Sequence, residues 1–470
     1  MKTKVFVLVL FWTLWLILPI SESNAINLME NRLSIHGFLE NQTAIRAQEG
    51  VNDEWKLSRF RNTLQVETEL KIAEETKIVF IGRGFFDGSW DLQSSLIQSP
   101  KDAHTVPDGE NMKRDFDARE YYIIGRLGRL VYKIGRQQIA WGESDLFRMA
   151  DIINPIDYSR RLTFESFENI RIPLRMADFI YEFPGPNEFK IEVVINPEDF
   201  RPHAFASPGA NWDPVWSAFN YSYKDLGTLP FAEAFWKQMK HDLKNLGKYD
   251  LDNFQGGSRL RGKFDGFDIS LFYYWSRVQS AVSVLDFTVS PFPMRFKWPR
   301  VHTVGGTCNF YEAITKTVFR FESAYTFDQP FTLDHPFIPG LSDSEYAEKD
   351  TFAFMIGFDR STWIRFLNPT KTFFISGQVF SKFIINPHSS SGLNFPIGHR
   401  LQTGLGKKGR SNNETTATLG ISTDYSIGNQ KITPDLTGAY IFKENAGVII
   451  PSIEWRPIPP FIYDVLSNAA

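Results

Sequence analysis

Charged residues of both signs recur at every second position in several segments, and this spacing places side chains on one face of a β-strand. In segment 57–72, arginine and glutamate occupy one phase and large apolar residues the other. If such a face borders an enclosed aqueous space, a basic row opposite an acidic row sets up a transverse field that favours anions or amphiphilic acids. Alternatively, the charges pair and brace the walls. The candidates are Arg59, Arg61, Glu67, Glu69, Glu120, Arg259, Arg261, Lys263, Arg320 and Glu322.

Signatures of catalysis are weak in this sequence. It contains no GxSxG, no HExxH and no complete GxxxxGK[ST] motif. His36 and His302 lie in strand-like segments, and neither is next to a serine-centred motif. We therefore predict a protein that is not an enzyme and needs no cofactor. Four acidic residues could bind calcium through oxygen ligands, but their spacing lacks the EF-hand pattern, so we predict no metal site; they are Glu143, Asp145, Asp151 and Asp157.

The alternation of polar and apolar residues continues through most of the sequence, which predicts an all-β protein. Many segments exceed ten residues, which is long enough to cross a bilayer at a tilt, whereas strands of soluble sandwiches are about 5–6 residues long. We predict about sixteen strands, near 33–47, 56–73, 76–88, 116–127, 129–140, 173–183, 188–196, 251–265, 266–280, 300–311, 316–328, 351–361, 371–384, 413–427, 430–443 and 447–457.

The connections after even-numbered segments are short, and most of those after odd-numbered segments are long. The short ones carry turn residues such as Leu127-Gly128, Asp265-Gly266 and Gly428-Asn429. This parity is typical of an up-and-down antiparallel barrel in an outer membrane, with short periplasmic turns and long extracellular loops. The charged candidates above then become pore-lining residues. The long connections are 89–115, 141–172, 197–250, 281–299, 329–350 and 385–412.

The composition of the chain and its N-terminal segment predict a protein that is exported from the cytoplasm. Of 470 residues, 15% are aromatic and Cys308 is the single cysteine; the formal charge of −3 implies no attraction to nucleic acid. Residues 1–25 have the basic, apolar and small-residue regions of a cleaved signal peptide. We predict a barrel over 26–457 and a periplasmic tail at 458–470. That tail lacks a final aromatic residue, which leaves open whether the last hairpin of the barrel is missing from this chain.

Two long connections are candidates for narrowing the barrel. Loop 141–172 either folds into the pore or caps its mouth; we expect Trp141 at the outer membrane interface and Gly142 to permit a sharp turn. In loop 197–250, segment 229–248 has helical periodicity and is either a gate in the lumen or a helix packed on neighbouring loops. Candidate constriction residues are Trp141, Gly142, Glu143, Asp145, Arg148, Asp151, Asn154, Pro155 and Asp157.

A family resemblance rests on three motifs. Gly135-Arg136-Gln137-Gln138, then Trp141-Gly142-Glu143 and Asn154-Pro155-Ile156-Asp157, resemble a porin-like outer-membrane family whose domain has no assigned function. Members look distantly similar to alginate-export barrels. The resemblance implies traffic of hydrophobic or amphiphilic molecules, alongside an inner-membrane exporter of the resistance-nodulation type and a periplasmic lipoprotein.

We therefore expect a passive outer-membrane channel for small hydrophobic, amphiphilic or anionic solutes. The alternative is a plugged structural or adhesive barrel whose long loops bind a surface partner and which transports nothing.

Overall fold

The computed structural model describes most of the chain between Ile26 and Arg456. The described residues are 26–47, 55–92, 105–106, 110–144, 148–159, 167–197, 199–206, 229–246, 251–289, 293–334, 342–385, 413–427, 430–442 and 445–456. The expected signal peptide and C-terminal tail lie outside these residues, and so does Asp145. No helix within the described ranges is long and apolar enough to cross a membrane.

One 18-stranded antiparallel sheet dominates the structure, and it includes the short strands β1 (Ile26–Leu28) and β20 (Tyr425–Ile427). The other sixteen strands, from β2 to β22, are joined in chain order by fifteen antiparallel pairings, as an up-and-down arrangement requires. They are β2 (Leu33–Ala47), β3 (Trp55–Ala73), β4 (Thr76–Asp87), β6 (Arg114–Leu127), β7 (Leu130–Gln137), β8 (Leu174–Glu182), β9 (Lys190–Asn196), β11 (Gln255–Phe264), β12 (Phe267–Arg277), β15 (Arg300–Glu312), β16 (Thr317–Asp334), β17 (Ser342–Thr362), β18 (Phe373–Ile384), β19 (Asn413–Thr423), β21 (Gln430–Ile441) and β22 (Ala446–Arg456). The predicted fold class is confirmed.

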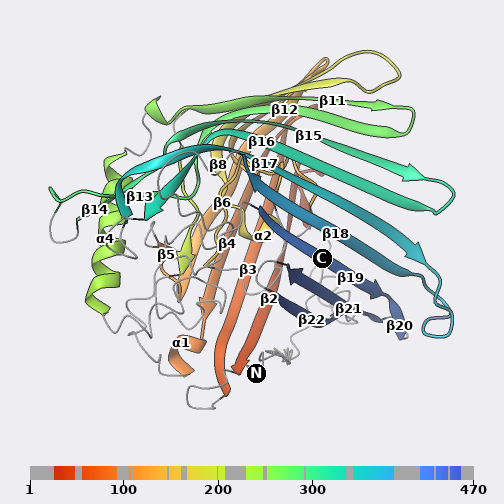
Figure 1. Ribbon diagram of the computed structural model, residues 1–470. Helices are drawn as coiled ribbons and strands as arrows, with labels where there is room; N and C mark the ends of the chain where they lie inside the picture. Colours follow the sequence, from red (N-terminus) through yellow and green to blue (C-terminus); the bar gives the residue numbers. More distant parts are fainter. Residues whose placement is uncertain are drawn as a thin grey trace.

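The sheet curves around an interior (Figure 1), and its two faces differ in composition. On β3, Arg59 and Arg61 face inward and are 1% and 5% exposed, whereas Leu64, on the opposite face, is 53% exposed. Large apolar side chains on the outer face of other strands are exposed as well, including Phe80, Leu271, Ile356 and Leu419. An apolar outer face with a polar inner face is the arrangement of a transmembrane barrel.

The long connections carry small elements of their own. β5 (Thr105–Val106) pairs with β10 (Phe205–Ala206), and α1 (Ser89–Leu92) follows β4. The 3₁₀ turn η2 (Leu251–Asn253) precedes β11. Strands β13 (Val282–Leu285) and β14 (Met294–Lys297) form a separate hairpin. The backbone N–H of Ser283 donates to Thr332 Oγ1 at 3.1 Å, so this hairpin rests on the outer extension of β16.

Helix α4 (Leu229–Asn245) lies beside the β13–β14 hairpin rather than in the lumen (Figure 1). Met239 and Leu243 pack against the apolar cluster that includes Phe296 of β14, and Asp242 Oδ2 accepts a hydrogen bond from the backbone N–H of Phe296 at 2.8 Å. Of the two placements considered for this helix, the structure therefore has the helix packed on neighbouring loops.

Asp286 caps the tip of the same hairpin. It accepts hydrogen bonds from Thr288 Oγ1 and Arg295 Nε, both at 2.6 Å. The Thr288 hydroxyl, followed by the Arg295 guanidinium, lowers the pKa of Asp286 to about 2.

Candidate functional site

The chain leaves β7 at Gln137 and crosses the interior of the sheet before β8 begins. We call residues 138–173 the inner segment; residues 145–147 and 160–166 of it are outside the described ranges. It includes the short helix α2 (Phe167–Ile170). Its contacts reach strands on several sides of the interior, so it lies inside the sheet.

Asn154 fastens the two ends of the inner segment together. Its side chain is fully buried; Oδ1 accepts from the backbone N–H of Ile139 at 2.9 Å, and Nδ2 donates to the carbonyl of Ile172 at 2.9 Å and to that of Gln137 at 3.3 Å. Buried backbone groups outside regular structure need such partners. Asn154 supplies them where β7 has ended and β8 has not yet begun.

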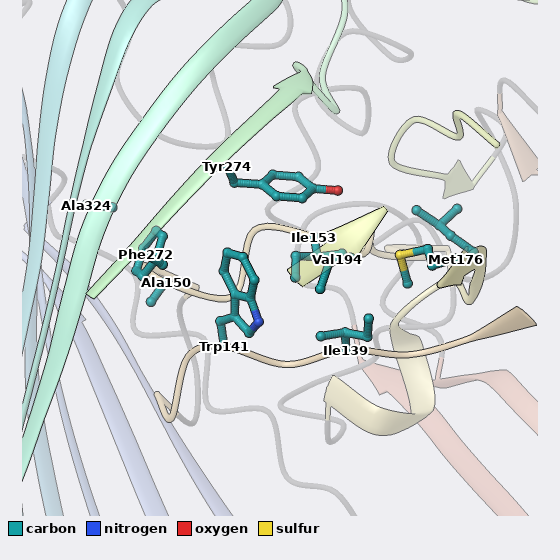
Figure 2. Packing of buried hydrophobic residues seen from close by; sticks show 10 residues of the cluster. Ile139, Trp141, Ala150, Ile153, Met176, Val194, Phe272, Tyr274 and Ala324 are labelled. Carbon is teal, nitrogen blue, oxygen red and sulfur yellow. The ribbon is translucent and has the colours of Figure 1, made fainter. Parts of the chain in front are cut away.

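Trp141 is the centre of the apolar core of this segment (Figure 2). It is 1% exposed, and its ring lies 5.5 Å from that of Phe272 and 5.7 Å from that of Tyr274, both on β12. The expectation that Trp141 sits at the lipid interface is therefore wrong. The residue follows the turn into the interior, where its apolar area is removed from both water and lipid.

A carboxylate on β9 holds the indole from the other side. Glu192 Oε1 accepts from Trp141 Nε1 at 2.8 Å, and Glu192 Oε2 accepts from Arg259 Nε and Nη2 at 2.9 and 2.6 Å. The guanidinium of Arg259 also lies 5.7 Å from the centre of the Trp141 ring. Glu192 is 6% exposed, so its negative charge is buried and is neutralised by Arg259 rather than being accessible to solutes in the lumen.

A second buried carboxylate lies within the segment itself. Asp151 Oδ2 accepts from Arg148 Nε at 3.1 Å and from Arg171 Nε at 2.8 Å. Arg148 also donates from Nη2 to the carbonyl of Asn154 at 2.6 Å. Asp151 is 2% exposed, and a buried carboxylate needs such partners. Together these bonds hold residues 148–154 and Arg171 in a fixed arrangement.

Glu322 of β16 attaches the first half of the inner segment, at Glu143 and Ala150, to the surrounding sheet. Its carboxylate accepts from the backbone N–H of Glu143 and, at 3.2 Å, from that of Ala150. Arg320, two residues earlier on the same face, donates from Nη1 to the carbonyl of Glu143 at 2.7 Å. Asn309 of β15 donates to the Glu143 carboxylate.

Side chains on the opposite wall hold α2 and the residues around it. Arg119 of β6 donates to the carbonyls of Glu168 and Arg171, the latter at 3.0 Å. Arg83 of β4 donates from Nη2 to Asn169 Oδ1 at 3.0 Å. In the adjoining loop, His203 Nδ1 accepts from the backbone N–H of Ile156 at 2.9 Å.

Gly142 lies where the inner segment passes closest to β16. Its φ is not positive, so a left-handed backbone conformation is not the reason for glycine at this position. Instead, a Cβ at this position would lie 2.7 Å from the backbone nitrogen of Asp151 and 3.1 Å from Glu322 Oε2. Glycine is required here because the backbone at position 142 passes very close to the backbone of Asp151.

Replacing Gly142 with alanine is therefore expected to destabilise the protein by about 1–3 kcal/mol, the usual range for overpacking. Denaturant unfolding in lipid vesicles measures the change. Gly420→Ala on β19 is the control, because its nearest neighbour would be Thr437 Oγ1 at 3.4 Å, an ordinary contact. Equal stability of the two variants would show that the inner segment can shift to make room.

A cavity of about 380 Å³, which we call the hollow, lies between the inner segment and the wall formed by β15–β19. On the wall side it is lined largely by residues with small side chains. On the other side, Arg148, Ile152 and Tyr158 border it. The small wall residues are Thr303, Ala324, Thr326, Thr351, Ala353 and Thr416.

The predicted pore-lining residues mostly have partners on neighbouring strands. Arg59 Nη1 donates to Gln42 Oε1 at 2.7 Å, and Arg61 lies 3.8 Å from Asp87 and over the Phe85 ring. The remaining pairs are Glu67–His36 at 3.0 Å, Glu69–Lys77 at 2.7 Å, Glu120–Gln138 at 2.9 Å, Arg259–Glu192 at 2.6 Å, Arg261–Asp268 at 2.8 Å, Lys263–Glu188 at 2.8 Å and Arg320–Asp359 at 2.9 Å. Glu322 binds backbone N–H groups instead. Most of these charges thus brace adjacent strands.

The predicted constriction residues have separate tasks. Trp141, Glu143, Arg148 and Asp151 make the contacts described above. Asp157 accepts from the backbone N–H of Ser159 at 3.0 Å, and the carbonyl of Pro155 accepts from the backbone N–H of Ile172 at 2.8 Å. Among the described residues, no group of three or more His, Cys, Asp and Glu side chains is placed to hold a metal ion.

Sequence reasoning missed several residues that hold the inner segment, namely Glu192, Arg119, Arg171, His203 and Tyr274. The alternation on β9 and β12 does place Glu192 and Tyr274 on the inner face. No sequence signal, however, indicates that Trp141 lies against them.

Comparison with known proteins supplies a family. Residues 25–455 match the family described as a protein of unknown function (DUF1302), and no curated protein matches the chain. Similar solved structures include the outer membrane channel DcaP of Acinetobacter baumannii, at 8% identity and a TM-score of 0.40, covering 93% of this chain and 98% of that one.

Two further structures are Salmonella typhi OmpF in complex with daunomycin and Pseudomonas putida OprB. OmpF is 8% identical, with a TM-score of 0.42 and coverage of 90% of this chain and 97% of that one. OprB is 12% identical, with a TM-score of 0.42 and coverage of 90% and 92%. Because the family match extends over nearly all of the sequence, the chain belongs to the DUF1302 family, whose function is unknown.

Proposed function

We propose that the protein is a porin-like channel of the bacterial outer membrane, for passive passage of small solutes. The observation that carries this proposal is the hollow, a cavity inside the sheet that borders the inner segment on one side and five strands on the other. An exposed apolar outer face supports the membrane location.

The passage follows one side of the interior. Toward β4, β6, β9 and β12, the inner segment is held by buried side chains such as Arg119, Glu192 and Tyr274. Toward β17–β19 it borders the hollow, where Thr351 and Ala353 present short side chains. Diffusion down a concentration gradient along this side requires no cofactor.

We further propose that the solutes are small hydrophobic, amphiphilic or anionic molecules. The hollow combines apolar surface from Ile152, Val301 and Phe380 with polar groups that include Lys382. The accompanying proposal, that the protein acts alongside an inner-membrane exporter and a periplasmic lipoprotein, is supported by the family resemblance.

A structural or adhesive barrel without transport is the second candidate. The number of fixed contacts that Trp141, Asp151 and Glu322 make favours it, because an interior held this rigidly could stay closed.

Single-channel recording in planar lipid bilayers distinguishes these candidates. We expect the full chain to give discrete conductance steps, and a variant that lacks residues 143–168 to give larger steps, because the inner segment no longer narrows the lumen. Circular dichroism of the purified variant verifies that it keeps its strands. A folded deletion variant without current would contradict the channel and favour the structural candidate.

A further inference from the structure

Lys382 lines the hollow together with two arginines, and it differs from them in its hydrogen bonding. Lys382 lies on the inner face of β18, where Ala353 of β17 and Glu414 of β19 are its cross-strand neighbours. Within the part of the chain that the structure describes, the Lys382 ammonium has no ion-pair or hydrogen-bond partner.

The two arginines that line the same cavity are engaged elsewhere. Arg148 binds Asp151 and the carbonyl of Asn154. Arg277 donates to Asn253 Oδ1 at 3.0 Å and to the carbonyl of Trp298 at 3.0 Å. An ammonium group has three hydrogen-bond donors. Lys382 is therefore the cation lining the hollow whose hydrogen-bond donors can bind a ligand.

Apolar side chains next to Lys382 complete a site of mixed character. Phe380 precedes it by two residues on the same face and is 3% exposed. Val301 of β15 and Ile152 of the inner segment border the same space, and Phe167 of α2 adds an aromatic ring. A volume of about 380 Å³ is within the range of pockets that hold a small organic ligand.

We propose that the hollow is a binding subsite for a compact organic monoanion, a carboxylate with an aromatic or branched apolar body. The carboxylate binds the Lys382 ammonium, and the body packs against Phe380, Val301 and Ile152. A single anionic group matches the one ammonium among the described residues that line the hollow, while the nearby acids Glu414 and Asp151 disfavour a second negative charge on the ligand. The inference rests on the proposed channel, because it assigns one step of the passage to this residue.

Three ligands of one shape and different charge test the site: benzoate, benzamide and benzamidine. Ligand-observed NMR on the full chain in detergent measures affinity, and reversible interruption of single-channel current in planar bilayers measures occupancy of the passage. We expect benzoate to bind most tightly and benzamidine most weakly. In Lys382→Met, benzoate affinity should fall about tenfold, while benzamide affinity stays unchanged.

A control variant sharpens the test. Lys77→Met is the matched control, since Lys77 is paired with Glu69 at 2.7 Å and does not line the hollow. Equal affinities for benzoate and benzamide, or equal effects of Lys382→Met and Lys77→Met, would overturn the inference. Charge-selective binding without any channel current would support the subsite and contradict the channel.

Discussion

Replacing Glu322 with alanine is expected to detach the inner segment from β16 and to raise the fraction of time that the channel is open. The change leaves the backbone N–H groups of Glu143 and Ala150 without their acceptor. Each buried donor left unpaired costs about 1–3 kcal/mol. A loss of about 2 kcal/mol already shifts the equilibrium between the attached and the detached states about 30-fold. Single-channel recording measures the open fraction.

A second measurement makes this prediction independent of channel activity. A detached segment should be cleaved faster by a protease added to liposomes that contain the purified protein. Glu312→Ala is the control, because Glu312 lies on the same β15–β16 hairpin but accepts from the backbone N–H groups of Ile314 and Thr315 in its own turn. If Glu322→Ala matches this control in both measurements, Glu322 does not anchor the segment.

Replacing Glu192 with alanine is expected to destabilise the protein by about 3–5 kcal/mol, the cost of leaving a buried charge without its partner. The variant leaves the guanidinium of Arg259, whose side chain is 14% exposed, without its carboxylate and removes the acceptor of Trp141 Nε1. Denaturant unfolding in lipid vesicles, followed by tryptophan fluorescence, measures the loss.

A matched pair for comparison lies near the turn ends of β11 and β9, with Lys263 on β11 and Glu188 in the turn before β9. Lys263 and Glu188 form an ion pair at 2.8 Å, but both side chains are 54% exposed, so Glu188→Ala should cost less than about 1 kcal/mol. Adding Arg259→Met to Glu192→Ala should recover part of the loss, because it removes the orphaned charge. Equal costs for the two glutamate variants would mean that burial of Glu192 contributes nothing.

The strands were predictable from the sequence because their pattern depends on local alternation. Segment 56–73 was expected and β3 is Trp55–Ala73; segment 430–443 was expected and β21 is Gln430–Ile441. The largest differences occur at the outer ends of β16 and β17, where the lipid boundary no longer sets strand length. β16 and β17 extend to Asp334 and from Ser342 because they also support the β13–β14 hairpin, through contacts such as Ser283 N–H to Thr332.

The site was less predictable, because its residues meet across long separations in sequence. The motif around Trp141 indicates the right stretch of sequence, and the alternation of polar and apolar residues places Glu322 on the inner face. Neither fact indicates that the backbone of Glu143 binds Glu322 179 positions later. An indole is common at the lipid interface, which favours that place for Trp141, but the chain turns inward after Gln137 and brings the ring to Glu192.

The long separations of these contacts also set an order for the folding of the chain. Gln138 meets Glu120 across 18 positions, Trp141 meets Glu192 across 51, and Arg259 is 118 positions from Trp141. Closing a longer loop costs more conformational entropy, and each partner must first be held in its own paired strand. The inner segment can therefore dock early against β6 and β9, while its bonds to Glu322 wait for β16. Contacts of the inner segment with β6 and β9 can form first, and those with β16 follow. The hydrogen bonds to Glu322, which are expected to control opening of the channel, are therefore among the last to form.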